Sequence, residues 1–86
     1  MKNSAGLAER AELLAELSAM QKAYRAAVNE WVTAIRAEED LASVDPTMAE
    51  VDEWEQAHFK EEEARNKAKT AKKDYEDAIR QDLFYF

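Results

Sequence analysis

The sequence DLASVDP, residues 40–46, decides the fold, because it interrupts a chain that otherwise consists of helix-forming residues. Pro46 is the only proline of the chain, and a proline ring cannot continue a helix that begins before it. Asp45 followed by Pro46 is typical of a helix N-cap and first helical position. Thr47 with Glu50 offers a rival capping box. Both patterns predict that a second helix starts immediately after this stretch.

The two arms on either side are rich in Ala, Glu, Lys, Leu and Arg, and the only glycine lies near the start. This composition predicts an all-α protein with coiled-coil-like helices. We expect a helix over about 4–40, a turn over about 41–46 and a helix over about 47–82. The length is typical of one domain, residues 1–86, folded back as an antiparallel hairpin.

The apolar residues of the first arm recur with heptad spacing. They form three lines: Leu7, Leu14, Gln21, Val28, Ile35 and Ala42; Arg10, Leu17, Tyr24, Trp31 and Glu38; and Leu13, Met20, Ala27, Ala34 and Leu41. Three lines are wider than a two-stranded seam requires, which indicates packing against more than one helix. Gln21 is expected either to fix the register of the core or to lie at the edge of this stripe.

The corresponding lines of the second arm consist mostly of alanine. They are Ala57, Ala64, Ala71, Ala78 and Tyr85, and Trp54, Glu61, Ala68, Tyr75 and Asp82. A chain that folds back at Val44–Asp45 places Tyr24 near Ala64, Trp31 near Ala57 and Leu17 near Ala71. Bulky residues then face small ones, which permits a close approach of the helices.

A thin hairpin with an alanine seam buries little apolar surface. Leu13, Met20, Val51, Ile79 and the terminal aromatic residues would remain in water in a monomer. We therefore expect a homodimer in which two hairpins form a four-helix bundle. The alternative is a monomeric hairpin that buries this surface on a different protein.

The net charge of −7 argues against direct nucleic-acid binding, which requires a basic face. A local basic patch does occur at Arg65, Lys67, Lys69, Lys72 and Lys73. Acidic residues surround it, and Glu61 with Arg65, Glu63 with Lys67 and Glu76 with Arg80 have the spacing of intrahelical ion pairs. The chain has no cysteine and no apolar run of membrane-spanning length, and no signal peptide is visible. A cytoplasmic protein without membrane contact is expected.

The predicted bend is unusually acidic, since no Lys or Arg occurs between Ala37 and Phe59. The helix dipole favours acids at the start of the second helix, but it disfavours Glu38, Glu39 and Asp40 at the end of the first. This conflict suggests a docking site for a basic protein surface, with Met48 beside it as an apolar contact; the alternative is a merely solvated bend. The candidate site residues are Glu38, Glu39, Asp40, Asp45, Glu50, Asp52, Glu53 and Trp54.

The chain ends in four large apolar residues, Leu83, Phe84, Tyr85 and Phe86. They are candidates either for packing over the start of the first helix, around Leu7, Leu13 and Leu14, or for a hydrophobic tail that docks on a partner.

Glu55 and His58 have the Glu-x-x-His spacing of di-metal helical bundles, in which Glu30 or Glu62 would add carboxylates. Helical geometry argues against this site, because His58 falls on the flank of the seam and Glu55 points away from it. No nucleophile motif or glycine-rich loop is present. We therefore expect no metal, no cofactor and no enzymatic activity.

In outline, the chain resembles the subunits of type III secretion needles, which are short helical hairpins with an Asp-Pro turn. Asp45–Pro46 and a later Arg65–Asn66 pair carry the likeness, although their spacing requires gaps and this second helix is more highly charged. The resemblance implies a structural polymer. The runner-up to protein docking among binding functions is an acidic nucleic-acid mimic that blocks a DNA- or RNA-binding protein.

The leading hypothesis is a non-enzymatic protein-interaction module, such as an inhibitor, an adaptor or an assembly chaperone. By analogy of class alone, small acidic helical proteins of this kind are common among phage-encoded inhibitors of host machinery.

Overall fold

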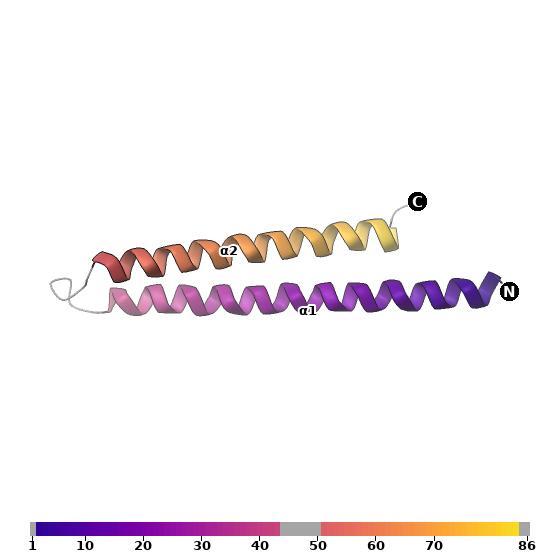
Figure 1. The fold of residues 1–86 in the computed structure, drawn as a ribbon, viewed down its shortest axis with the longest axis horizontal. Helices are drawn as coiled ribbons and strands as arrows, with labels where there is room; N and C mark the ends of the chain where they lie inside the picture. The colour runs from indigo at the N-terminus through magenta and orange to yellow at the C-terminus, as the bar shows by residue number, and fades with distance from the viewer. Residues whose placement is uncertain (1, 44–50, 85–86) are drawn as a thin grey trace.

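Two long helices dominate the molecule (Figure 1). The computed structural model describes the backbone of residues 2–43 and 51–84 and the side chains of residues 8–43 and 51–82. Helix α1 spans Lys2–Ala42 and helix α2 spans Val51–Ile79. Helix α2 is followed directly by a π-helical turn, η1, over Arg80–Phe84. The expected positions of Asp45, Pro46, Thr47, Met48 and Glu50 lie outside the described residues.

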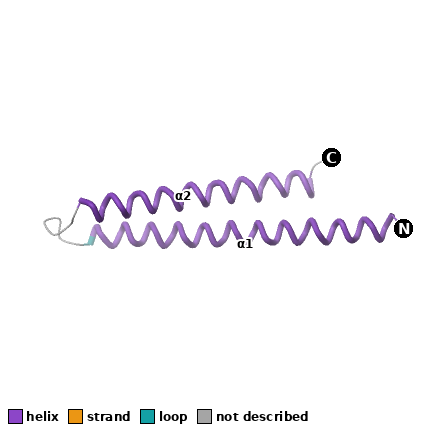
Figure 2. The backbone as a smooth tube through the Cα atoms, viewed as in Figure 1, coloured by secondary structure: helices purple, strands orange, loops and turns teal. Residues whose placement is uncertain are grey.

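The helices run antiparallel and side by side along their length (Figure 2), which confirms the predicted helical hairpin. The molecule measures 72 × 18 × 15 Å. Within the described ranges, neither helix has a segment that is long and apolar enough to cross a membrane.

Residues at the end of α1 explain where this helix stops. The carbonyl oxygen of Asp40 accepts a hydrogen bond from the backbone N–H of Ser43 at 3.2 Å and another from the Ser43 hydroxyl at 2.7 Å. Both bonds satisfy a carbonyl that has no partner further along the helix. On the opposite side of the bend, the first described turn of α2 contains Asp52 and Glu53, which the positive end of a helix dipole favours.

The contact between the helices, which we call the seam, is narrow. Leu17, Ala27 and Ala68 are the only buried apolar residues among those described. The half-buried residues around them come from the second and third heptad lines of α1 and from both lines of α2, namely Tyr24, Trp31, Ala34, Leu41, Ala57, Ala64, Ala71 and Tyr75. In the first heptad line of α1, Leu14, Ile35 and Ala42 are exposed and only Val28 is half-buried among the described residues. Gln21 is also exposed, which places it at an edge rather than in the core.

The pairing of residues across the seam differs from the expected one. Trp31 contacts Glu61 rather than Ala57, and Tyr24 lies beside Tyr75, with 6.3 Å between ring centroids. Both partners lie further along α2 than expected, by four residues for Trp31 and by eleven for Tyr24, so the expected register is wrong. The physical reason is the point of reversal. The pairs Glu38–His58 and Glu30–Lys67 both have their midpoint near position 48, which lies beyond the expected Val44–Asp45.

Candidate interaction surfaces

A polar contact in the seam fixes the two helices relative to one another. The indole Nε1 of Trp31 donates a hydrogen bond of 2.9 Å to Oε2 of Glu61. The Arg65 Nε atom lies 3.3 Å from the same oxygen, and the Glu61 side chain is only 14% exposed. This Arg65 atom is buried but is not aligned for a hydrogen bond with any described residue, so its contact with Glu61 is electrostatic. The sequence suggested the Glu61–Arg65 pair but not the bond from Trp31.

A histidine lies between the helices near the bend. His58 Nδ1 lies 3.8 Å from Glu38 Oε1 of α1, and its Nε2 lies 3.6 Å from Glu62 Oε2. His58 thus occupies the flank of the seam, as helical geometry predicts. Glu30, proposed above as a possible metal ligand, instead pairs with Lys67 at 3.1 Å. Within the described part of the chain, no group of three or more Asp, Glu or His side chains is arranged to hold a metal ion.

The described acids of the candidate docking site divide into two groups. Glu38 is only 25% exposed in its side chain and faces His58, so it belongs to the contact between the helices. Glu39, Asp40, Asp52 and Glu53 are exposed to solvent on both sides of the bend. The last turn of α1 contains no basic residue that would offset the helix dipole. Asp45 and Glu50 lie outside the described residues.

Large apolar side chains accompany these acids on α2. Val51 is 70% exposed, Phe59 is 65% exposed and Trp54 is 44% exposed. Because residues four apart share a helix face, Val51, Glu55 and Phe59 lie in one row on the surface of α2. Phe59 is not among the functional candidates predicted from the sequence. The sequence does contain a sign that Phe59 is exposed. Phe59 is an aromatic residue outside both heptad lines of the second helix, and Glu55 and Glu63 lie four residues before and after it.

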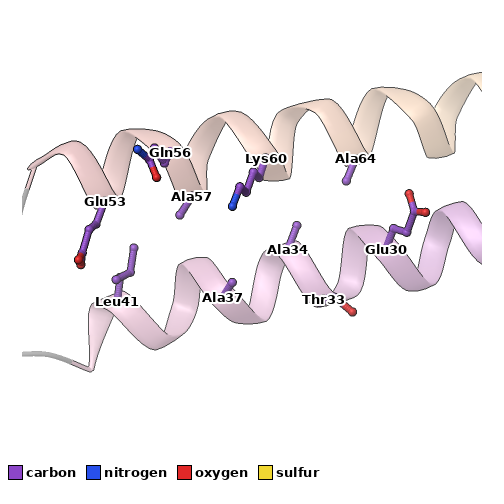
Figure 3. Close-up of a pocket in the computed structure, with 10 residues that line it drawn as sticks. All are labelled: Glu30, Thr33, Ala34, Ala37, Leu41, Glu53, Gln56, Ala57, Lys60 and Ala64. Atoms are coloured by element: carbon purple, nitrogen blue, oxygen red, sulfur yellow. The ribbon is translucent and has the colours of Figure 1, made fainter.

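A shallow trough runs between the helices on one side of the hairpin (Figure 3). Its volume is about 540 Å³, and small residues form much of its lining. The lining residues are Glu30, Thr33, Ala34, Ala37, Leu41, Glu53, Gln56, Ala57, Lys60 and Ala64. The alanines that permit close helix approach therefore also leave a groove beside the seam.

Ion pairs cover the C-terminal half of α2. Lys73 donates a 2.8 Å hydrogen bond to Asp77, which also accepts one of 2.9 Å from Arg80. The bond from Lys73, followed by the positive charges of Lys73 and Arg80, lowers the pKa of Asp77, and the same bond raises the pKa of Lys73. The predicted Glu76–Arg80 pair is confirmed at 3.4 Å.

The basic patch predicted on α2 is thus largely paired with acids. Lys72 faces Glu76 at 3.8 Å, and Lys67 pairs with Glu30 of α1 rather than with the expected Glu63. At the end of the chain, the backbones of Leu83 and Phe84 belong to η1. Their side chains, and Tyr85 and Phe86 entirely, lie outside the described residues.

Comparison with known proteins adds no functional information. The chain matches no protein-family model, and no curated protein or solved structure is significantly similar to it.

Proposed function

We propose that this chain is a non-enzymatic cytoplasmic interaction protein that binds a protein with a basic surface through the acidic bend end of its hairpin. One observation carries the proposal. Val51, Trp54 and Phe59 expose large apolar surfaces at the start of α2, in a region of sequence that contains no Lys or Arg between Ala37 and Phe59.

The two kinds of side chain at this end have different roles in binding. Exposed carboxylates attract a basic surface over a long range and accelerate association. Buried aromatic contacts contribute most of the affinity at typical interfaces. Glu39 and Asp40 at the end of α1 and Asp52 and Glu53 at the start of α2 supply the charge. Trp54 and Val51 supply apolar contact within the same few turns.

The proposal includes a homodimer in which two hairpins form a four-helix bundle. The described residues of one hairpin include only three buried apolar side chains, Leu17, Ala27 and Ala68. A second hairpin would cover apolar groups that a single hairpin leaves in water. The protein would then act as an inhibitor, an adaptor or an assembly chaperone.

Charge reversal at the bend tests the binding site. In the bend variant, Glu39→Lys, Asp40→Lys and Asp52→Lys replace three exposed acids. A matched control places the same three charge changes at the opposite end of α1, with Glu9→Lys, Glu12→Lys and Glu16→Lys, which are also exposed. Each variant is immobilised and exposed to lysate of the native host, and the retained proteins are identified by mass spectrometry.

We expect wild type and the control to retain the same basic protein, which the bend variant loses at least tenfold. The affinity of the purified partner should also fall as salt increases, because the steering charges are exposed. Equal retention by both charge-reversed variants would contradict the proposed site.

A further inference from the structure

Two uncharged heptad lines, one from each helix, border the trough and continue along the hairpin. Leu41 and Ala34 of α1 and Ala57 and Ala64 of α2 line the trough itself (Figure 3). Away from the bend, the same lines continue with apolar residues alone, including Met20, which is 38% exposed. We call this surface the trough face. Its residues are Leu13, Met20, Ala27, Ala34, Leu41, Ala57, Ala64, Ala71 and Ala78.

The opposite side of the hairpin is less suited to packing against a second copy. Its heptad line on α1 includes exposed Leu14 and Ile35, but the line beside it on α2 contains His58, Arg65 and Lys72. These three polar side chains are partly exposed, so a second hairpin on this side would remove charged or titratable groups from water. The two lines of the trough face contain no such group.

We propose that the trough face is the site where a second copy packs in the homodimer, with a twofold axis running along the trough between the two copies. This assignment rests on the proposed homodimer. Rotation about such an axis does not shift the copies along their length, so α1 of one copy lies over α2 of the other in the register that the helices already have within one hairpin. The contact therefore occurs twice, and every pair of neighbouring helices is antiparallel. Leu41 lies beside Leu41 of the second copy, and the two side chains fill the bend end of the trough.

The charged residues at the edge of the trough fit this arrangement. Glu30 and Lys67 are paired at 3.1 Å within one hairpin, and both side chains remain more than half exposed. Because the axis retains the register, Lys67 also lies over Glu30 of the second copy, so two glutamates and two lysines alternate in sign. Seven residues closer to the bend on each helix, Lys60 lies over Ala37 rather than over another cation. Opposite charges therefore meet across the interface, and a small residue leaves room for the longer lysine.

The exposed area of one hairpin is sufficient for such an interface. The chain exposes 7160 Å². A compact monomer of 9.9 kDa is expected to expose about 5,200 Å², which leaves an excess of about 2,000 Å². A stable interface buries roughly 800 Å² or more on each partner. The trough face is about 42 Å long from Leu13 to Leu41, so it supplies a contact along most of the hairpin.

This homodimer leaves the proposed site for the basic partner accessible. Val51 and Phe59 lie in one row on the side of α2 away from the trough, whereas Gln56 and Lys60 line the trough. An axis parallel to the helices also places the two acidic bends at the same end of the bundle. One dimer therefore presents twice the negative charge of a single hairpin to a basic partner.

One pair of variants tests the interface separately from the homodimer. Ala37→Arg places a guanidinium over Lys60 of the second copy at the edge of the trough. Val32→Arg is the matched control, because Val32 is exposed five residues earlier on the same helix and does not line the trough. Sedimentation equilibrium over a wide range of protein concentration gives the dissociation constant, and circular dichroism verifies that each variant remains helical.

We expect wild type and Val32→Arg to be dimers. Ala37→Arg should dissociate about a hundredfold more readily, because like charges then meet twice across the symmetric interface. A monomeric wild type would overturn the homodimer itself. A dimeric Ala37→Arg with an unchanged dissociation constant, or a Val32→Arg variant that alone becomes monomeric, would overturn the trough face as the interface while leaving the homodimer intact.

Mixing two variants tests the register that the twofold axis imposes. Glu30→Lys and Lys67→Glu each bring like charges together, both within one hairpin and across the interface of their own homodimers. In a mixed dimer, the introduced lysine of one chain lies over the introduced glutamate of the other, and native Lys67 lies over native Glu30. Native mass spectrometry of an equal mixture, with one variant isotope-labelled, measures the amounts of the three dimers.

We expect the mixed dimer to exceed each homodimer about tenfold or more, whereas chance alone gives about twofold. Each chain keeps the same contacts within its own hairpin in every dimer, so this preference reports only the contact between copies. A mixture at the chance ratio would overturn the pairing of Glu30 with Lys67 across the interface, and with it the twofold axis along the trough.

Discussion

The hydrogen bond from Trp31 to Glu61 should contribute a measurable part of the stability, and Glu61→Ala tests this. The bond is 2.9 Å long and partly buried, and it connects the two helices directly. Removing the carboxylate leaves the indole N–H without its acceptor and the buried Arg65 Nε without its counter-charge. An unsatisfied donor of this kind costs about 1–3 kcal/mol, while the higher helix propensity of Ala returns roughly 0.4 kcal/mol.

We therefore expect Glu61→Ala to lower the free energy of unfolding by about 2 kcal/mol, which corresponds to roughly 8–16 °C in Tm for a chain of this size. Glu61→Gln retains an oxygen that accepts the indole N–H, so it should cost less, about 1 kcal/mol or below. Thermal and urea unfolding are followed by circular dichroism at one fixed protein concentration, since the proposed dimerisation would make Tm depend on concentration.

A double-mutant cycle with Trp31→Phe isolates the bond itself. Once the indole N–H is absent, Glu61→Ala should cost about 1 kcal/mol less than it does in the wild-type background. Strictly additive effects, or a Tm of Glu61→Ala within about 2 °C of wild type, would refute the reasoning that this bond secures the register of the helices.

Two further predictions concern packing and charge. Ala68, only 3% exposed, lies where the helices approach closely, so Ala68→Leu should cost about 1–3 kcal/mol in urea unfolding, whereas Leu at exposed Ala26 should leave stability nearly unchanged. Lys73→Gln should raise the pKa of Asp77 towards its ordinary value, as measured by NMR titration of the carboxyl carbon, although Arg80 still holds it somewhat low. Because the pKa of Asp77 is lowered in the folded state, the stability that Asp77 contributes is lost as pH falls through that lowered pKa. This loss of stability in acid should be smaller in Lys73→Gln. The pKa of Lys73 is raised, so the stability that Lys73 contributes is lost as pH rises through that raised pKa. An unchanged pKa of Asp77 in Lys73→Gln would contradict the hydrogen bond from Lys73 as the main cause of the lowered pKa.

The sequence was sufficient to predict two antiparallel helices, because heptad spacing and a single proline act locally. It also identified Leu17, Ala27 and Ala68 as members of core lines, and these are the buried residues. It did not distinguish which of three apolar lines on α1 faces α2, since all three lie within one wide stripe. The first line, with Leu14 and Ile35, is the one that remains exposed.

The register could not be obtained from the sequence for a geometric reason. Each residue added to the connection between two helices shifts every pairing across the seam, and alanines fit opposite one another at many positions. The pairing is instead marked by large polar or aromatic groups, Trp31 with Glu61 and Tyr24 with Tyr75. A glutamate on a core line opposite an amphipathic tryptophan was the available signal, but it becomes informative only when both positions are known to face each other.

The unequal lengths of the helices give the hairpin a direction of opening. Helix α1 extends past the end of η1 (Figure 1), and every described side chain from Ala8 to Glu12 is exposed. A helical segment of this length without a neighbour is only marginally stable in water. Each turn of α1 contacts only the turn of α2 beside it. We therefore expect the two helices to separate first at the end away from the bend, and the separation to spread from there towards the bend. The protection of backbone amides against hydrogen exchange should accordingly rise along α1 from Ala8 to Ala27.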